Sequence, residues 1–548
     1  MKEFFKQRIY RGLVRRLNNL KIARTSYLVS RIAPAPSGQP IAFFKASTGI
    51  DDLSWNSGFH LLASWALRLQ GIPVAYFACN SGMSKCVLGT NRDQPHKEMP
   101  CKTCVMQARA LYAGVDGDKN TGRHVDTYTG THVNWFFFER DPQLVTRISQ
   151  LSLPELSTFH FQSIPLGPLC LPALRWVLRI HHLNDDENTR YLLREYILSA
   201  WNVARKFETF LDATNPRAVV VFNGQFFPEA TAAHLARKRG IRVITHEVGF
   251  KTGTAFFTDG EATIYPIHIP DSFEMSEREN NLLDEYLAKR FQGDFTMAGI
   301  QFWTNMKKLD ESFLKKAAGF QQIVPIFTNV IFDTSQPHAN VVFEDMFHWL
   351  DETLSVIRKH PQTLFVIRAH PDEMRVRKSS RETVGEWVTR HGVDKEANVI
   401  FISPRETLSS YDLIQRSKFV MVYNSTIGLE ASILGVPVLC AGRARFTQYP
   451  TVFFPRTVEE QRATLEEFLN AEKIETPAGF TRNARRFLYY QVFRSSLPFD
   501  DFLEPSVRTT QTRLKKFDLE KLSPANSRAM RTIFDGLLNG GDFLMRGD

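Results

Sequence analysis

Long apolar runs are missing from this 548-residue chain. No stretch approaches the ~20 apolar residues that a membrane-spanning helix needs, and the N-terminus lacks the uninterrupted apolar segment of a secretory signal. Cysteine is scarce too, because six residues in so long a chain do not resemble the disulfide framework of a secreted domain. Internal repeats and low-complexity tracts are also lacking. These absences predict a globular protein of the cytoplasm.

The chain is mildly basic, and its charge is unevenly placed. Lys and Arg number 68 against 58 Asp and Glu, which gives a net charge of +10 and a pI of about 9.2. Residues 1–24 carry eight basic side chains against the single acid Glu3. Nucleic acid, anionic lipid and phosphorylated substrates are all compatible with such an excess. Because no aromatic-basic recognition motif accompanies it, we expect no nucleic-acid partner.

The basic N-terminal segment also carries apolar residues at helical spacing, namely Phe5, Ile9, Leu13, Leu17 and Leu20. This pattern predicts a basic amphipathic helix. The helix would either dock on its own domain or attach to an anionic membrane surface, where each cation contributes on the order of 1 kcal/mol. The expected location is therefore the cytoplasm, with peripheral attachment to the inner face of the membrane as the alternative.

The stretch 419–446 reads as a strand, a turn, a helix and a second strand. Its turn holds Asn424, Ser425 and Thr426, whose short polar side chains stand where the first unpaired helix N–H groups point. An oxyanion placed there would meet donors and the positive end of the helix dipole. Ser or Thr at such a position often does nothing but cap the helix. A second feature is needed to favour a ligand.

That feature is the stretch 363–373. Its apolar run 364–367 predicts a strand that ends in Arg368, His370 and Pro371, where the proline forces the chain out of the sheet. Ligands of open parallel sheets bind at the carboxyl ends of strands. We therefore expect the guanidinium and the imidazole to face the same crevice as the turn at Ser425.

These motifs resemble those of a known family. His370-Pro371, Ser425-Thr426-x-Gly428-x-Glu430 and Gly435-x-Pro437-Val438 look like the C-terminal half of the capsule polysaccharide biosynthesis glycosyltransferases, which have the two-domain GT-B fold. The resemblance covers roughly residues 215–450, since it extends to Thr328-Asn329, Asn223-Gly224 and His246-Glu247-x-Gly249. In sialyltransferases and Kdo transferases of similar architecture, the His-Pro and Ser-Ser or Ser-Thr motifs hold the nucleotide phosphate of the donor. The resemblance implies that role for His370, Ser425 and Thr426.

Strand and helix patterns alternate along most of the chain, which predicts an α/β fold with parallel sheets. Together with the resemblance, this predicts a GT-B-like fold: two Rossmann-like domains that face a central cleft, with helical N- and C-terminal extensions. The expected segments are a basic N-terminal segment 1–35, an acceptor domain 36–265, a helical interdomain segment 266–318, a nucleotide-sugar domain 319–475, and C-terminal helices with a tail 476–548.

Two strand ends of the first domain are expected to line the acceptor side of the cleft. These strands end at Asn223-Gly224 and at His246-Glu247. The Glu247 carboxylate could deprotonate an acceptor hydroxyl, or it could only cap a helix or pair with a local arginine. Asp259 is the second choice for the base. His60, near the start of an expected helix, is a further candidate on the acceptor side.

Four cysteines fall within 26 residues, as Cys79-x6-Cys86-x14-Cys101-x2-Cys104. The last pair has the spacing that lets two thiolates reach one tetrahedral metal, so a structural zinc or an iron–sulfur cluster is one interpretation. The other is that Cys79 simply belongs to a buried strand. Four protein ligands would leave no open position, so such a metal would be structural.

The leading hypothesis is transfer of a sugar from a nucleotide donor, linked to CMP, UDP or GDP, to a glycan or lipid-linked acceptor of the cell surface or capsule. We expect the donor to be held by Arg368, His370, Pro371, Asn424, Ser425, Thr426, Glu430 and Asn329. Glu430 would bind ribose hydroxyls or be buried against Arg443 or Arg445. Donors aimed at the departing phosphate lower the barrier without a metal cofactor.

The D-x-D signature of the other large glycosyltransferase fold has one match, Asp116-Gly117-Asp118, whose surroundings are those of a turn. Two rival functions are left open. One is a non-hydrolysing sugar-nucleotide 2-epimerase, which shares the fold. The other is a non-catalytic scaffold subunit of a polysaccharide assembly complex.

Overall fold

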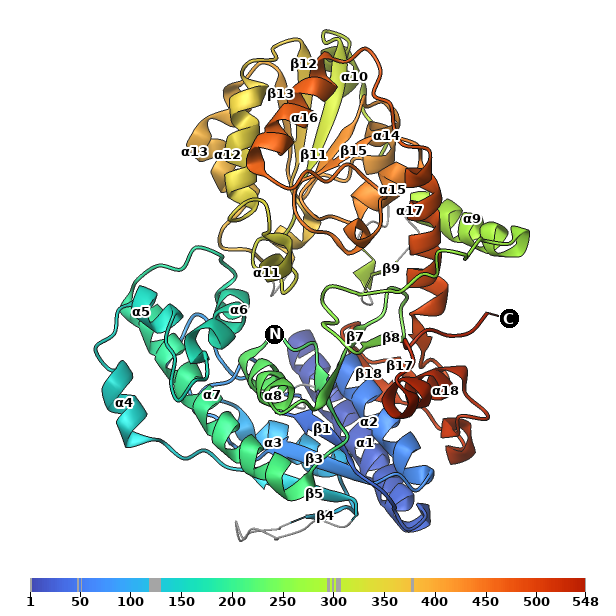
Figure 1. The fold of residues 1–548 in the computed structure, drawn as a ribbon. Helices are drawn as coiled ribbons and strands as arrows, with labels where there is room; N and C mark the ends of the chain where they lie inside the picture. Colours follow the sequence, from blue (N-terminus) through green and yellow to red (C-terminus); the bar gives the residue numbers. More distant parts are fainter. Residues whose placement is uncertain are drawn as a thin grey trace.

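The computed structural model describes residues 2–46, 49–50, 52–117, 130–292, 296–297, 300–301, 307–375 and 379–547. It contains two α/β units, one above the other in Figure 1, each built on its own sheet. We call them the first unit, which holds the N-terminal sheet, and the second unit, which holds the sheet of residues 322–440. A C-terminal segment runs beside the second unit and then returns to the first.

The first unit is organised around an eight-stranded sheet of order β16-β8-β7-β6-β1-β3-β5-β4. The strands from β7 to β4 pair in parallel, whereas β8 and β16 join one edge through antiparallel pairings. Strands β1 and β6 read IAFFK and AVVVF, and such β-branched and aromatic runs suit strands that helices cover on both faces. The main strands are β1 (Ile41–Lys45), β3 (Val74–Cys79), β4 (Asp116–Gly117), β5 (His132–Phe136), β6 (Ala218–Phe222), β7 (Arg242–Val248) and β8 (Thr254–Thr258). The helices are α1 (Lys2–Ile32), α2 (Trp55–Leu69), α3 (Cys101–Leu111), α4 (Pro142–Ile148), α5 (Leu153–Ser157), α6 (Leu166–Leu178), α7 (Glu187–Thr214) and α8 (Phe227–Lys238).

The second unit has a five-stranded parallel sheet of order β13-β12-β11-β14-β15. The chain therefore starts in the middle of the sheet, moves to one edge, and returns to build the other half. The strand order reverses between β11 and β14, and ligands of doubly wound sheets bind at such a switch point. The strands are β11 (Gln322–Phe327), β12 (Thr363–Arg368), β13 (Val399–Ile402), β14 (Val420–Val422) and β15 (Val438–Cys440). The helices are α10 (Glu311–Ala317), α11 (Gln336–Ala339), α12 (Met346–Ile357), α13 (Val384–His391), α14 (Ser410–Gln415), α15 (Ile427–Ile433) and α16 (Val458–Asn470).

Two segments connect the units. The first crossing contains α9 (Glu277–Phe291) and the short hairpin of β9 (Thr296–Met297) and β10 (Ile300–Gln301). The return crossing is α17 (Gly479–Tyr489), which packs on α15 and continues as a π-helical turn into β16 (Leu497–Pro498) at the edge of the first sheet. A three-stranded sheet of β17 (Leu503–Pro505), β18 (Gln511–Leu514) and β2 (Leu53–Ser54) and the helix α18 (Arg528–Phe534) complete the first unit. The C-terminal residues therefore complete the fold of the N-terminal ones.

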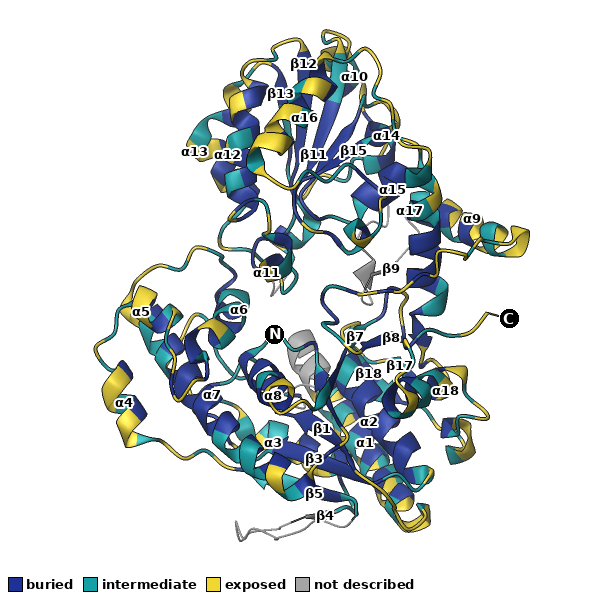
Figure 2. Ribbon diagram, viewed as in Figure 1, coloured by how far each residue is buried: buried dark blue, intermediate teal, exposed yellow. Residues whose placement is uncertain are grey.

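The α/β architecture, with one mostly parallel sheet and one fully parallel sheet, confirms the predicted fold class. The strand predicted at 364–367 lies within β12, which runs from Thr363 to Arg368. Both sheets lie between helices and are buried on both faces, as Figure 2 shows in dark blue. None of the described helices is long and apolar enough to cross a membrane.

Helix α1 forms as predicted, but a different face of it is buried. It packs on α2 and α3 through Val14, Ile22 and Val29, of which the last two are fully buried. The predicted apolar face stays exposed, since Leu13 and Leu17 keep more than half of their surface in solvent. The helix therefore docks on its own unit and leaves a second apolar stripe uncovered.

Candidate functional site

A cavity of about 290 Å³ opens at the carboxyl ends of the second unit's strands, where the two units meet. All eight residues predicted to hold the donor line it. The first unit contributes Trp176 and Arg179, at the end of α6, to the same cavity. The structure therefore brings the His-Pro and Ser-Thr segments together on one space, although they lie more than fifty residues apart in sequence.

The switch point of the second sheet lies at the base of this cavity. Asn329 follows β11 and Asn424 follows β14, and the Asn329 side-chain amide donates a hydrogen bond to Asn424 Oδ1. Ser425 and Thr426 come next, ahead of α15, and Thr426 makes no side-chain capping bond to that helix. A Cβ atom on Gly428 would lie 2.9 Å from Val422, so glycine lets α15 pack directly against β14. The polar turn is thus held close to the sheet.

The geometry around His370 sets its tautomer. The backbone N–H of Asp372 donates to His370 Nδ1 over 3.1 Å, so that nitrogen carries the lone pair. Burial lowers the pKa of His370 below its ordinary value of 6.5, so the ring is neutral near pH 7 and its proton lies on Nε2. The neutral ring of His370 is part of the cavity lining. The turn after Pro371, a single 3₁₀ turn over Pro371–Met374, supplies that Asp372 amide.

Glu430 lines the cavity but already has partners. Its carboxylate accepts hydrogen bonds from Arg290 Nε at 2.9 Å and Nη2 at 2.6 Å, and the Tyr411 hydroxyl donates to its other oxygen. The side chains of Arg290 and Glu430 are almost entirely buried. Of the two predicted uses, burial against an arginine is the one observed, but the partner is Arg290 of α9 rather than Arg443 or Arg445.

The cavity is rich in arginine. The five that line it are Arg179, Arg290, Arg368, Arg443 and Arg445. Burial lowers the pKa of Arg179 and of Arg368 to about 10, so both remain charged at neutral pH. Arg179 stacks on Trp176, with its guanidinium carbon 3.9 Å from the ring centroid. The carboxylates in the same lining are Asp333, Asp372 and Glu430, so the five arginines leave an excess of positive charge and the cavity suits an anionic ligand.

Glu247 lies across the cleft, at the carboxyl end of β7. Its oxygens accept hydrogen bonds from Asn56 Nδ2 at 3.0 Å and Asn223 Nδ2 at 3.2 Å. Burial raises its pKa, and these bonds offset part of the effect. The next residue, Val248, accepts a hydrogen bond from Tyr265, whose ring packs under the guanidinium of Arg445. Glu247 therefore lies beside the inter-unit cleft, although it is not among the residues that line the cavity.

The other residues predicted on the acceptor side lie in two different places. Asn223 and Gly224 form a turn after β6 in which both have positive φ, and Asn223 orients Glu247. His60 was expected in the cleft, but it is 2% exposed in the core of the first unit, and its Nδ1 faces His246 Nε2 at 3.2 Å. Its ring packs edge-on to Phe43. The prediction for His60 is wrong because α2 turns that face onto the sheet.

Asp259 also lies away from its predicted position on the acceptor side of the cleft. It follows β8, which runs antiparallel to β7, so it lies at the opposite end of the sheet from Glu247. There its carboxylate pairs with Arg242 at 2.8 Å, with about half of its side-chain surface in solvent. Asp259 is not among the cavity-lining residues. The antiparallel reversal of β8 is what the sequence reading missed.

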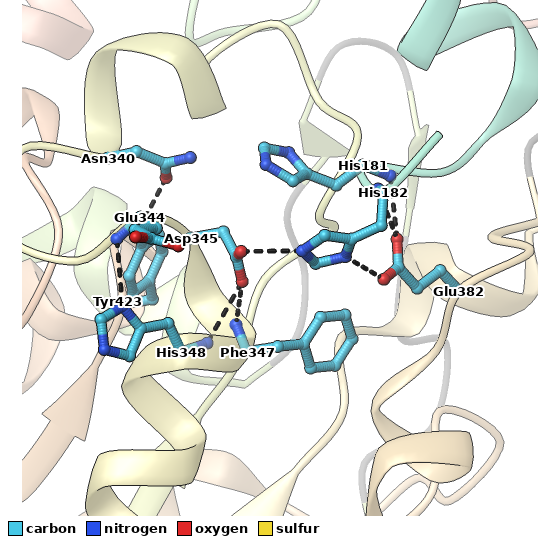
Figure 3. A network of polar contacts seen from close by, with 9 residues as sticks. All are labelled: His181, His182, Asn340, Glu344, Asp345, Phe347, His348, Glu382 and Tyr423. Atoms are coloured by element: carbon cyan, nitrogen blue, oxygen red, sulfur yellow. Dashed lines mark hydrogen bonds and ion pairs between the residues drawn. The ribbon is translucent and has the colours of Figure 1, made fainter. Parts of the chain in front are cut away.

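A polar clasp joins the two units on one flank of the cavity (Figure 3). We define it as His182, Asp345 and Glu382. His182 Nε2 lies 3.0 Å from Asp345 Oδ2, and its Nδ1 bonds to Glu382, which also accepts the backbone N–H of His181 at 2.9 Å. Its hydrogen bonds to Asp345 and Glu382 raise the pKa of His182 to about 10. The clasp is therefore a cation held between two carboxylates of the other unit.

The four cysteines predicted as metal ligands also converge, since all of them line one small cavity in the first unit. None of them is in a disulfide. Asp116 and Gly117 form the edge strand β4, and Asp118 lies outside the described residues.

Several cavity residues have no signal in the sequence, among them Trp176, Arg179, Arg290, Asp333 and His338. Arg179 and Arg290 are isolated arginines in helical segments. The sequence pattern alone predicts that such residues lie on the surface. His338 is held by Glu261 at 2.8 Å across the units. Arg179 has a left-handed backbone with φ of 66°, which its sequence context does not predict.

Comparisons with known proteins agree with the predicted family resemblance over part of the chain. Residues 304–450 match a family model described as capsule polysaccharide biosynthesis protein. The predicted resemblance is therefore confirmed for the second unit, whereas residues 215–303 lie outside the match. No curated protein matches the chain.

Solved structures similar to the chain include the KpsC beta Kdo 2,4 transferase of Thermosulfurimonas dismutans, at 12% identity over 55% of this chain and 84% of that one, with a TM-score of 0.33. Another is the Methanocaldococcus jannaschii UDP-GlcNAc 2-epimerase in complex with UDP-GlcNAc and UDP, at 14% identity over 53% of this chain and 80% of that one, with a TM-score of 0.24. At these TM-scores the superpositions are loose, so the family match and the site geometry carry the interpretation.

Proposed function

We propose that this chain is a glycosyltransferase that moves a sugar from a nucleotide-sugar donor to a surface or capsular glycan. The observation that carries the proposal is the convergence of His370 and of Ser425 with Thr426 on one arginine-rich cavity at a topological switch point. The family match of residues 304–450 supports a role in capsule polysaccharide synthesis.

The donor phosphate would lie between the His-Pro turn and the Ser-Thr turn. As the bond between the anomeric carbon and the phosphate oxygen breaks, its electron pair goes to that oxygen and the sugar becomes cationic. The Nε2–H of His370, the hydroxyls of Ser425 and Thr426, and the guanidinium of Arg368 would stabilise the growing negative charge. One such donor is worth ~3 kcal/mol. These residues would stabilise the departing phosphate without a metal ion.

The acceptor would enter from the first unit. Its hydroxyl proton would pass to the Glu247 carboxylate while its oxygen forms the new bond to the anomeric carbon. The raised pKa of Glu247 makes it a stronger base than an exposed glutamate. Asn56 and Asn223 hold the carboxylate in place. This assignment is supported by position and burial.

Helix α1 would place the enzyme on an anionic membrane. Its exposed apolar residues, each with close to half or more of its surface in solvent, are Ile9, Tyr10, Leu13, Leu17, Leu20, Tyr27, Leu28 and Ile32. Arg16, Arg24 and Arg31 are exposed on the same helix. Beside it lies a groove of about 400 Å³ with an apolar floor and four cations, Lys21, Arg24, Lys515 and Lys516.

Anionic lipid is the occupant that this surface fits best. Acyl chains would cover the leucines while the arginines reach phosphate headgroups. A second copy of the helix would instead bring like charges together, which is unfavourable.

The test of function is a thermal-shift screen of the full chain with CMP, UDP, GDP and, as a control, free phosphate. A nucleotide present at about a hundred times its Kd adds ~2.7 kcal/mol of stability. We expect one nucleotide to protect the wild type and to lose its effect in His370→Ala. If no nucleotide protects the wild type, the donor-site proposal is wrong.

The same nucleotide sugar then separates the enzyme classes. A transferase leaves it intact without an acceptor, apart from slow hydrolysis, whereas a 2-epimerase isomerises the sugar on its own. A scaffold subunit would leave it unchanged with any acceptor and would show no nucleotide protection.

A further inference from the structure

Four cysteines from three parts of the first unit meet at one point. Cys79 ends β3, Cys86 lies in the loop that follows, and Cys101 and Cys104 occupy the first turn of α3. All four line a single cavity of about 20 Å³. Its other walls are mainly apolar and include Ala46, Ile50, Met83, Leu88, Met99 and Val105. Four thiols around one small, mainly apolar cavity form a ligand set that a packed core does not require.

Backbone amides point at two of the sulfurs. The N–H of Gly82 lies 3.2 Å from Cys79 Sγ, and the N–H of Gly89 lies 3.3 Å from Cys86 Sγ. A Cβ atom on Gly89 would sit 3.2 Å from that sulfur, so glycine is what lets the backbone approach it. Hydrogen bonds to sulfur stabilise the thiolate form that metals bind.

Two buried lysines flank the cysteines. Lys45 and Lys85 each expose 5% of their surface. Lys45 is close enough to Cys104, and Lys85 to Cys86, for their charges to interact. A centre held by four thiolates carries net negative charge, and these two ammonium groups would offset it.

We propose that Cys79, Cys86, Cys101 and Cys104 hold a thiolate-bound iron–sulfur cluster. Around one zinc ion the sulfurs would stand about 3.8 Å apart, from Zn–S bonds of ~2.3 Å in a tetrahedron. Among the described residues, only His181, His182 and Asp345 bring three ligand atoms within 4.8 Å of one another. No three of the four sulfurs therefore lie as close together as one zinc ion requires, whereas a cluster binds each thiolate at a separate iron.

The centre is structural, because four protein ligands leave it no open position. It would fix the loop between Cys86 and Cys101, which reaches the second unit. In that loop Arg92 Nη1 donates to the Ser379 carbonyl at 3.4 Å, and Asp93 pairs with Arg381. The metal would thus hold a loop that bridges the units beside the donor cavity.

The test starts with the full chain purified without oxygen. We expect about four iron and four acid-labile sulfide per chain, with the visible absorption of a bound cluster that bleaches on reduction. Cys101→Ser and Cys104→Ser should each lose at least most of the iron. The matched control is Cys170→Ala, since Cys170 is buried in the same unit but lies apart from the cavity. It should keep the wild-type iron content.

A second measurement does not depend on the variants folding. In the wild type, hydrogen exchange across residues 87–100 should rise several-fold once the metal is removed, with exchange in the second sheet unchanged. About one zinc per chain, lost in both serine variants, would keep the thiolate centre and overturn the cluster. Metal-free wild type with four freely titrating thiols, or a disulfide between any two of them, would overturn the whole proposal.

Discussion

The imidazole of His182, in the first unit, lies 3.0 Å from the carboxylate of Asp345, at the start of α12 in the second unit (Figure 3). The other ring nitrogen of His182, Nδ1, bonds to the carboxylate of Glu382. Asp345 also caps α12 by accepting the backbone N–H of Phe347 and of His348. The contact between the units is therefore fixed to a helix end, and it depends on the protonation of one imidazole.

The clasp predicts a pH dependence of the inter-unit contact. The pKa of His182 is raised from 6.5 to about 10, so its stabilising contribution is complete below about pH 6.5 and is lost as pH rises toward 10. Burial would raise the pKa of Asp345, but His182 outweighs it and lowers that pKa to about 2, so acid weakens the contact only below about pH 4. Because the His182 side chain is 56% exposed, we expect an effect of about 1 kcal/mol or less.

The measurement compares thermal midpoints of the wild type and His182→Gln across that range. The two should differ most near pH 6 and converge near pH 10. A constant difference across the range would mean that His182 contributes by packing alone. His391→Gln is the control, because His391 stays within the second unit and lies 3.7 Å from Asp351.

The donor site predicts a loss of rate with the fold intact. His370→Ala removes one donor to the departing phosphate and should lower kcat about a hundredfold. His370→Gln, which keeps an N–H donor, should recover part of that loss. His360→Ala is a matched control, since His360 pairs with Glu466 on the far side of the second unit. Equal activity of wild type and His370→Ala would remove the imidazole from the mechanism.

The proposed base predicts a separation of binding from chemistry. Glu247→Gln keeps the hydrogen-bonding shape but cannot take a proton, so transfer should fall by about 10²–10⁴. Nucleotide protection in the thermal-shift assay should stay unchanged, because Glu247 belongs to the other unit. Glu396→Gln, a surface carboxylate paired with Arg358, should keep full activity. If Glu247→Gln transfers sugar at the wild-type rate, the base lies elsewhere.

The buried pair of Arg290 and Glu430 predicts a large effect on stability. Glu430→Gln leaves the Arg290 charge buried without its carboxylate, which should cost roughly 3–5 kcal/mol in the free energy of unfolding. The double variant Arg290→Met/Glu430→Gln should recover part of that cost, since no lone charge remains. Urea denaturation measures both. A single-variant loss below ~1 kcal/mol would show that water or Tyr411 replaces the lost charge interaction.

Helix α1 predicts binding to anionic vesicles. The full chain should sediment with vesicles that contain anionic lipid and should stay in solution with neutral ones, and salt should weaken binding. Leu13→Glu/Leu17→Glu places charge on the exposed stripe and should abolish sedimentation without changing stability, because both side chains already face solvent. Binding of this variant equal to that of the wild type would exclude the stripe as the contact.

Local patterns were enough to place the strands and turns that carry His370 and Ser425. The buried strand 364–367 and the polar turns after β12 and β14 were predicted because apolar runs, proline and turn residues act over a few neighbouring positions. The convergence of the His370 and Ser425 segments on one cavity followed from the same logic, since parallel strands present their carboxyl ends at one edge. His60 and Asp259 were misplaced because burial and strand direction depend on segments that pair from afar.

By itself, the sequence determined the α/β class, the two strand ends that carry His370 and Ser425, and four cysteines at metal-ligand spacing. Only the tertiary structure decided that Arg179 and Arg290 reach the cavity, that Glu430 is neutralised by Arg290 of a connecting helix, and that α1 leaves a second apolar stripe exposed. The physical reason is that period and turn chemistry are local, whereas the partner of a buried charge is chosen by packing between residues 140 positions apart.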